Sequence, residues 1–412
     1  MDTIAENYVK LLLRVEQYND DFVDAYCGPE KLRPPALDSN DKADFPFDEF
    51  LKEVTLLLEN LEAINQDALT ELEILRKTNL EKNLIAAKAG IDLLNGRQLT
   101  FDEESRLLYD AVAPQFSEAY FDSLLKGIDG ILPGKGELAE RHNRFVRQFI
   151  IPADKLDKVL KVATADARQR TGRYIDVPDN EKFEIAYVTD QPWTGYNWYK
   201  GNNHSLMEIN TELPIYIDWA LSLACHEGYP GHHVQSLLVE NHLYRGKGWV
   251  EFSIYPLYCP ASPIYEGAAN YGVKLAFPEK EQLAYEKEVL YPLAGIDPEL
   301  AEDYLALQKL KEKLRYSGVE VARRYLDGKI DRAAAKSWIM KYSLDTPEEA
   351  ENSIEFIEKY RTYIINYSLG EDMVKQYIDA HPEVAENPDK RWALLAELFT
   401  KPIRPSAEIE IR

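Results

Sequence analysis

The chain has 412 residues, of which 45% are hydrophobic and 29% charged, a composition typical of a globular protein with a large apolar core. Its formal net charge of −23 excludes the basic surface that nucleic acids and anionic membranes require, so we expect neither as a partner. The sequence has no recognisable signal peptide or membrane anchor, and its three cysteines are widely spaced, so we expect a cytoplasmic protein without disulfides.

Most of the chain has the residue spacing of amphipathic helices. Residues 1–180 carry apolar side chains at three- and four-residue intervals, which predicts a helical N-terminal region. Helix is expected again over about 215–243, and it dominates from there to the C-terminus. The most strongly periodic segments of the C-terminal part are 296–328, 331–343 and 346–368.

One segment, 181–213, differs from the rest because it is dense in aromatic residues, glycine, asparagine and proline. Two runs within it, FEIAYV (183–188) and SLMEIN (205–210), have the residue types of strands. The stretch TGYNWYKGNNH (194–204) between them is expected to be a long loop. The sequence therefore predicts a small sheet directly before the next helix.

These patterns together predict a mainly α fold. We expect an N-terminal helical region, 1–180, and a region 181–412 that holds the small sheet, the histidine-rich helix and the C-terminal helices. The two regions could also form one interwoven unit.

The segment ACHEGYPGHHVQ (224–235) contains three of the seven histidines. It begins with the His-Glu pair of the HExxH zinc-peptidase motif, in which a second histidine four residues later binds the same ion. Here that position is Pro230. On a straight helix His232 and His233 would lie about 9 and about 10.5 Å from His226 along the axis. Zinc ligands lie only about 2.0–2.2 Å from the ion, so neither histidine could join His226 on an undistorted helix.

The two residues in the middle of the segment supply a distortion. Pro230 cannot donate a hydrogen bond to the carbonyl of His226, and Gly231 can adopt unusual backbone angles. A two-residue bulge here would restore the i+4 relation and favours His232 as the second ligand, with His233 left to contact substrate or to support a ligand. The reverse choice stays open. Because apolar periodicity resumes directly afterwards, we expect a kinked helix that continues.

A zinc site that catalyses hydrolysis also needs a base and a third ligand. Glu227 is positioned to accept the proton of the attacking water and to return it to the leaving group. The candidate third ligand is Glu266, followed by the small residues Gly267–Ala269, which could pack closely on the first helix. His242 and His204 are the alternatives for this third ligand. His242 lies about 24 Å along the helix from His226, which is too far, and His204, in the expected loop, is better placed to contact substrate.

Hydrolysis of an amide further requires a group that stabilises the oxyanion. Tyr367, beside a glycine-containing turn, is the first candidate, and Arg315 and Tyr316 come next. No phosphate-binding loop, nucleophile elbow or Cys-His pattern is present to indicate another chemistry.

The motif HEGYPGHHVQ together with YEGAANY resembles the bacterial domain-of-unknown-function family 885, which carries HExxPGHHxQ and an EGWA-like motif and is treated as zincin-like. In this chain Ala268 stands where that family has tryptophan. Three further segments resemble the family, so the resemblance spans nearly the whole chain: FVDAYCGPEKL (22–32), MEINTELP (207–214) and YSLGEDMV (367–374).

This family is similar to helical gluzincins whose motif is HExGH. The resemblance implies a zincin-like helical metallopeptidase architecture, with His226, His232 and Glu266 as the ligands of one Zn²⁺ per chain. It also implies that the strand around Asn210 is the edge along which a peptide lies.

The sequence therefore predicts a gluzincin-type zinc metallopeptidase that hydrolyses short peptides. Two alternatives remain. One is a metal-dependent hydrolase of a non-peptide amide, and the other is a catalytically inactive helical binding protein.

Overall fold

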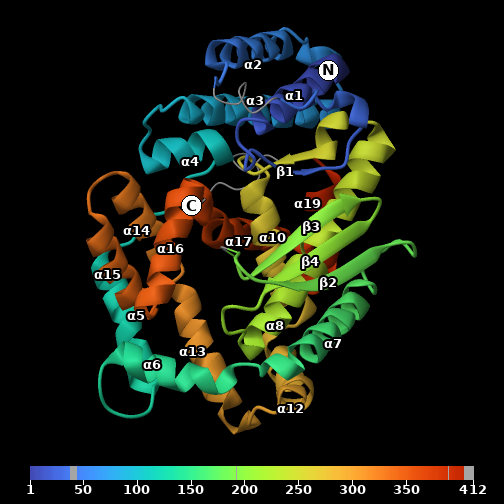
Figure 1. Ribbon diagram of the computed structural model, residues 1–412. Helices are drawn as coiled ribbons and strands as arrows, with labels where there is room; N and C mark the ends of the chain where they lie inside the picture. The colour runs from blue at the N-terminus through green and yellow to red at the C-terminus, as the bar shows by residue number, and fades with distance from the viewer. Residues whose placement is uncertain (38–43, 192, 388, 403–412) are drawn as a thin grey trace.

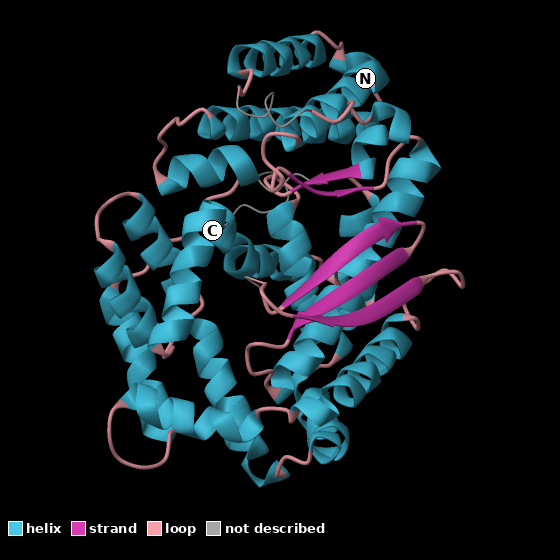
Figure 2. Ribbon diagram, in the orientation of Figure 1, coloured by secondary structure: helices cyan, strands magenta, loops and turns pink. Residues whose placement is uncertain are grey.

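The computed structural model describes residues 1–37, 44–191, 193–387 and 389–402. Helices make up most of these residues, and the strands form two small sheets (Figures 1 and 2). The expected mainly α fold, with a small sheet directly before the histidine-rich segment, is confirmed. No helix in the described ranges is both long and apolar enough to cross a lipid bilayer.

Three helices near the N-terminus form a layer at the top of Figure 1: α1 (Asp2–Glu16), α2 (Phe47–Glu62) and α3 (Glu71–Leu94). Helix α3 starts at a capping box, in which the Thr70 side chain accepts from the Glu73 N–H and the Glu73 carboxylate accepts from the Thr70 N–H. The apolar faces of these helices share a core cluster distinct from the larger one below. The boundary between 1–180 and 181–412 stays a prediction.

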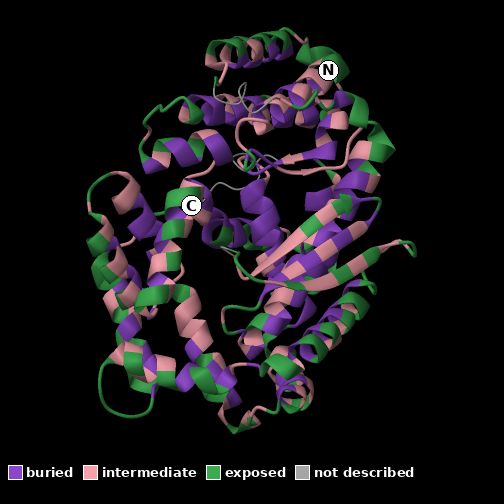
Figure 3. Cartoon of the chain, viewed as in Figure 1, coloured by how far each residue is buried: buried purple, intermediate pink, exposed green. Residues whose placement is uncertain are grey.

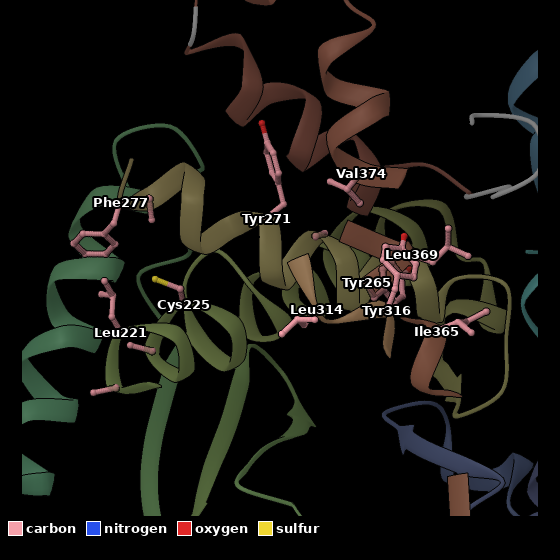
Figure 4. Packing of buried hydrophobic residues seen from close by; sticks show 14 of the residues in the cluster. Leu221, Cys225, Tyr265, Tyr271, Phe277, Leu314, Tyr316, Ile365, Leu369 and Val374 are labelled. Atoms are coloured by element: carbon pink, nitrogen blue, oxygen red, sulfur yellow. The ribbon is translucent and has the colours of Figure 1, made fainter. Parts of the chain in front are cut away.

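The remaining helices surround the larger core cluster, part of which Figure 4 shows. Their bounds are α4 (Phe101–Tyr109), α5 (Glu118–Ile131), α6 (Leu138–Val146), α7 (Ala153–Thr171), α10 (Ser262–Ala276), α11 (Glu279–Tyr285), α12 (Tyr291–Ala294), α13 (Ala301–Lys313), α14 (Tyr316–Leu326), α15 (Arg332–Tyr342), α16 (Pro347–Tyr360), α17 (Ile365–Asp379), α18 (Glu383–Glu386) and α19 (Lys390–Thr400). The periodic segment 296–328 is thus two helices, α13 and α14. Figure 3 shows that α10 and α17 are buried in the interior.

Helices α10 and α17 approach each other more closely than ordinary side chains allow. A Cβ atom on Gly370 would lie 1.9 Å from the carbonyl oxygen of Pro263, and one on Gly267 would lie 2.1 Å from the Gly370 carbonyl carbon. The sequence predicts that α10 packs on the histidine-rich helix through its small residues, and α10 does contact that segment. Gly267 faces α17 instead, whereas Gly272 lies against the segment, since a Cβ atom there would lie 2.9 Å from Pro230 Cγ.

The larger sheet has the order β2-β4-β3, with β2 (Lys182–Val188) parallel to β4 (His204–Asn210) and β3 (Gly195–Gly201) antiparallel to it. Strands β2 and β4 are the two that the sequence predicts. The long loop expected over 194–204 is wrong, because most of it forms β3. Its aromatic residues favour a strand, and the reversal needs only Asn202 and Asn203, which both have positive φ.

The position of β4 also corrects the expected peptide-binding edge. The strand around Asn210 is central, because β2 and β3 pair with it on both sides. Its backbone is therefore unable to pair with a substrate. The edge strand on the cavity side is β3.

A second, two-stranded sheet joins the N-terminal layer to the rest of the molecule (Figure 1). Strand β1 (Val23–Tyr26) pairs antiparallel with β5 (Ile254–Pro256). The register shifts between Val23 and Ala25, so Asp24 lies at an irregularity of the β-bulge type.

The histidine-rich segment follows the larger sheet. It consists of α8 (Ile217–Leu223), a π-helical turn η5 (Ala224–Gly228), α9 (His232–Leu238) and a second π-helical stretch η6 (Val239–Arg245).

Candidate metal centre

The helix containing the histidines is interrupted at Pro230 and Gly231 and then resumes. The Gly231 N–H donates to the carbonyl of Cys225 at 2.9 Å, six residues earlier instead of the four of a regular α-helix. This is the two-residue bulge that the sequence predicts. A Cβ atom on Gly231 would lie only 1.9 Å from the His226 carbonyl oxygen, so the bulge requires glycine here.

The bulge brings His226 and His232 onto one side, where Glu266 of α10 meets them. The two Nε2 atoms lie 3.1 Å apart, Glu266 Oε2 lies 3.3 Å from His226 Nε2, and Glu266 Oε1 lies 3.6 Å from His232 Nε2. Ligand atoms placed tetrahedrally about 2.0–2.1 Å from a zinc ion would be separated by about 3.3 Å. The spacing of the three side chains thus fits one such ion.

The chemistry of these donors fits a metal as well. Glu266 is buried, and its Oε2 atom has no hydrogen-bond partner among the described residues. A buried carboxylate oxygen without a partner is costly unless a cation binds it. Two imidazoles and one carboxylate are also the ligand set of catalytic zinc sites that keep a fourth position open.

Asn270 orients the first histidine. Its Nδ2 donates to the backbone carbonyl of Tyr367 at 3.0 Å, which leaves its Oδ1 to accept from His226 Nδ1 at 2.9 Å. With the proton on Nδ1, the lone pair of His226 is on Nε2, the atom that faces Glu266. Asn270 was not singled out in the sequence, although it lies one helical turn after Glu266 on the same face.

Tyr363 supports the carboxylate. Its hydroxyl donates to Glu266 Oε1 at 2.8 Å, so the two oxygens of Glu266 differ, one hydrogen-bonded and one free. Burial keeps the pKa of Tyr363 well above its usual range, so the hydroxyl remains a donor. Tyr363 was not singled out in the sequence, and the one signal for it is that it precedes the candidate Tyr367 by one helical turn.

Glu227 lines a cavity of about 700 Å³ together with His226, His232 and Glu266. Its carboxylate accepts no hydrogen bond from the described residues, so its lone pairs are available. Strand β3 forms one wall: Gly195 packs against Leu223 near the carboxylate, since a Cβ atom there would lie 2.5 Å from Leu223 Cδ2 and 3.8 Å from Glu227 Oε1.

Tyr367 lines the same cavity from α17, and its side chain is 38% exposed. Its surroundings raise the pKa of the phenol well above the ordinary value, first through desolvation and then through the charge of Glu266, so the hydroxyl keeps its proton. The other two candidates lie elsewhere. Arg315 and Tyr316 both bind Asp372, and neither lines the cavity.

His233 points away from the cavity, into the core behind it. Its Nε2 lies 2.9 Å from Glu181 Oε2 and its Nδ1 lies 2.8 Å from Ser205 Oγ. Tyr229 and Arg168 also donate to Glu181, so this carboxylate is fully engaged. Burial lowers the pKa of His233. Because both ring nitrogens have partners, His233 holds the resumed helix against the sheet.

The remaining two residues singled out in the sequence lie on the sheet. His204 binds Glu184 at 2.6 Å, and Asn210 donates to the carbonyl of Gln191 at 2.9 Å and accepts from the Glu212 N–H. Neither side chain lines the cavity.

No family model matches this sequence, and no curated protein matches it either. Its fold is similar to that of a candidate lipoprotein from Colwellia psychrerythraea, with a TM-score of 0.53 and 16% identity over 87% of this chain and 65% of that chain. This chain therefore spans slightly less than two thirds of that protein. At such identity the likeness concerns the fold alone.

Two further solved structures are similar at TM-scores below 0.5. Metallocarboxypeptidase 1 of Trypanosoma cruzi has a TM-score of 0.45 and 11% identity over 97% of this chain and 92% of that one. The M32 carboxypeptidase of Deinococcus radiodurans R1 has a TM-score of 0.39 and 12% identity over 96% and 87%. Fold and site together define a mainly helical protein with a candidate metal centre in a cavity of about 700 Å³.

Proposed function

We propose that this protein is a zinc-dependent hydrolase of gluzincin type that cleaves peptide bonds in short peptides. The observation that carries the proposal is the convergence of His226, His232 and Glu266, whose ligand atoms all lie within 4.8 Å of one another. Glu227 stands beside the first histidine in the same cavity, as a base for this reaction must.

Zinc bound here would polarise the scissile carbonyl and lower the pKa of the attacking water. Glu227 takes the proton from that water and passes it to the leaving nitrogen, so that amide and water yield a carboxylic acid and an amine. The Tyr367 hydroxyl donates a hydrogen bond to the oxygen on which negative charge develops. Asn270 keeps His226 in the tautomer that leaves Nε2 free.

Strand β3 gives the substrate a backbone to pair with. It is an edge strand that contributes five consecutive residues to the cavity wall, Gly195 to Tyr199. An extended peptide can add to such an edge through main-chain hydrogen bonds. The cavity volume of about 700 Å³ falls within the range of about 300–1,000 Å³ typical of small-ligand sites. Both features favour short peptides over folded proteins.

The test combines metal content with a variant of the base. We expect elemental mass spectrometry to find about one zinc per chain in the wild type and in Glu227→Gln, because Glu227 is not a ligand. Hydrolysis of a peptide pool should fall by roughly 100-fold or more in the variant.

Other outcomes separate the alternatives. Failure to hold zinc after loading, or unchanged hydrolysis in Glu227→Gln, would refute the proposal. Zinc bound at one per chain without cleavage of any peptide would instead favour a hydrolase of a non-peptide amide.

A further inference from the structure

A carboxylate outside the metal centre also reaches the cavity. Asp24 lies at the register shift of β1, between the paired residues Val23 and Ala25, and it lines the cavity. A β-bulge turns a side chain out of its regular alternation, and such bulges are common beside active sites. The irregularity of β1 thus coincides with the residue that it presents to the cavity.

Asp24 has no cationic partner among the described residues. Its hydrogen-bond donor is the neutral hydroxyl of Tyr196, on the edge strand β3. Other acids in the cavity wall are paired: Glu240 with Arg245 at 2.6 Å, Glu251 with Arg76 at 2.6 Å, and Asp21 with Lys359 at 3.2 Å. Of the other carboxylates that line the cavity, Glu227 and Glu266 belong to the candidate metal centre, and Asp20 is exposed.

Asp24 lines the same cavity as His232, Glu227 and Glu266 of the candidate metal centre, and its side chain is partly buried. A partly buried carboxylate next to other acids gains stability when a cation binds to it.

The rest of the wall is poorly suited to a substrate carboxylate. Among the described residues that line the cavity there is no arginine, and the single lysine, Lys359, is paired with Asp21. Recognition of a free carboxyl terminus usually relies on an available cationic side chain. An ammonium group is the better electrostatic complement to this cavity.

Two further aromatic rings lie beside the ring of Tyr196, the residue that donates to Asp24. The ring of Tyr196 lies 5.5 Å from that of Trp193 and 4.6 Å from that of Trp198, centroid to centroid. All three residues line the cavity. Aromatic faces attract ammonium groups, so the wall next to Asp24 has a second feature suited to a cation.

We propose that Asp24 binds the free α-ammonium group of a short peptide while the candidate metal centre takes a carbonyl near the same end, so that the enzyme acts on peptides from their amino terminus. This inference rests on the proposed function and specifies its substrate class. The ammonium donates a charge-assisted hydrogen bond to Asp24, and Tyr196 keeps the carboxylate in place.

The experiment compares matched tripeptide pools with both ends free, with the amino end acetylated, or with the carboxyl end amidated. For the zinc-loaded wild type we expect kcat/KM to fall roughly 10- to 100-fold on acetylation, the loss of a hydrogen bond to a charged group, and less than threefold on amidation. In Asp24→Asn the preference for the free amino end should nearly vanish, because kcat/KM for the free peptides falls toward the value for the acetylated ones.

Two variants control for indirect effects. Asp24→Glu keeps the charge and should retain part of the preference. Asp20→Asn removes one exposed charge from the same cavity and should leave the preference within twofold of the wild type. Thermal unfolding of each variant shows whether the fold is intact.

Several results would overturn the inference while leaving the proposed hydrolase intact. These are equal cleavage of free and acetylated peptides, an unchanged preference in Asp24→Asn, or loss of cleavage on amidation instead. If acetylated peptides that contain lysine were cleaved as well as the free pool, the ammonium group that Asp24 binds would be that of a lysine side chain. This result would overturn the amino-terminal assignment.

A binding measurement decides the case in which no peptide is hydrolysed. Isothermal titration of the Glu227→Gln variant with the free and acetylated pools reports recognition without turnover. Tighter binding of the free pool that depends on Asp24 supports the inference, and equal binding refutes it. Failure of the proposed hydrolysis is thereby distinguished from failure of the recognition.

Discussion

At the scale of single residues, the two adjacent histidines have opposite surroundings. His232 faces His226 and Glu266 in the cavity, whereas His233 is fully buried against Glu181 and Ser205. One position along the helix therefore separates a candidate metal ligand from a residue that fastens the helix to the sheet.

This difference predicts different losses in two alanine variants. His232→Ala should lose stoichiometric zinc, because two donors remain where three are needed. His233→Ala should keep most of its zinc but lose roughly 1–3 kcal/mol of stability, since Glu181 and Ser205 are left without their buried partner. Elemental mass spectrometry and urea unfolding measure the two effects. Zinc retained in the first variant and lost in the second would reverse the ligand assignment.

The residues around this site show how far the sequence could be interpreted. The convergence of His226, His232 and Glu266 was predictable, because a local proline and glycine supply the bulge and the small-residue segment after Glu266 marks the distant glutamate; their role as metal ligands stays a prediction. Asn270 and Tyr363 were not, although both hydrogen-bond a member of the cluster. Their roles depend on which helices meet, and a single sequence does not contain that information.

At the scale of elements, the pair α10 and α17 positions the site. Helix α10 carries Glu266 and Asn270, and α17 carries Tyr367, whose carbonyl Asn270 binds. Gly267 and Gly370 let the two backbones touch. Larger residues at this crossing would separate the helices and with them the groups of the site.

Gly370→Ala should therefore destabilise the protein and weaken zinc binding. Its new methyl group would lie 1.9 Å from the Pro263 carbonyl oxygen, a backbone atom that cannot rotate away. Overpacking of this kind costs typically about 1–3 kcal/mol. Gly130→Ala in α5 is the matched control, because nothing lies within 4 Å of its added Cβ, and it should be neutral or slightly stabilising. Equal stabilities in urea unfolding would contradict the role of the glycine contact.

The sheet shows a limit of local interpretation at this scale. Strands β2 and β4 were predictable from their apolar and β-branched residues, but β3 was not, because the glycine and asparagine residues that flank it are typical of a loop. The order β2-β4-β3, which places β3 at one edge, results from the parallel pairing of β2 with β4 past the intervening strand. Strand order of this kind depends on tertiary packing and not on residue preferences.

At the scale of the whole molecule, the cavity is assembled from parts that are far apart in the chain. Asp24 comes from the N-terminal part, Tyr196 from the sheet, Glu227 from the interrupted helix and Tyr367 from near the C-terminus. The mainly α class was predictable from periodicity, because it is the sum of local patterns. The cavity was not, since it exists only after every layer has packed.

The acidic composition of the molecule, with a net charge of −23, includes carboxyl groups that folding buries. Glu286 is almost fully buried, and burial raises its pKa to about 7, with a smaller opposing effect from the Gln282 side chain, which donates to it at 2.8 Å. The charge of Asp218 raises the pKa further. In the folded protein Glu286 is therefore protonated over a range in which the unfolded chain has already ionised it.

The sign of the resulting pH dependence follows from this shift. Below the unfolded pKa of about 4.5 the group is protonated in both states and costs nothing. As the pH rises from there to about 7, ionisation favours the unfolded chain, so the free energy of unfolding falls by up to about 3 kcal/mol. Above that range the loss is constant.

Glu286→Gln should remove this dependence while keeping a group that accepts from Gln282. From pH 5 to pH 8 we expect the unfolding free energy of the variant to rise by about 2–3 kcal/mol relative to that of the wild type. Urea unfolding of both proteins at the two pH values measures this difference. Comparing two pH values cancels any packing change caused by the substitution. Glu302→Gln is the control, because Lys287 lowers the pKa of that exposed carboxyl and the change should be small and of opposite sign. An equal pH response in wild type and Glu286→Gln would mean that Glu286 ionises in the fold as freely as in the unfolded chain.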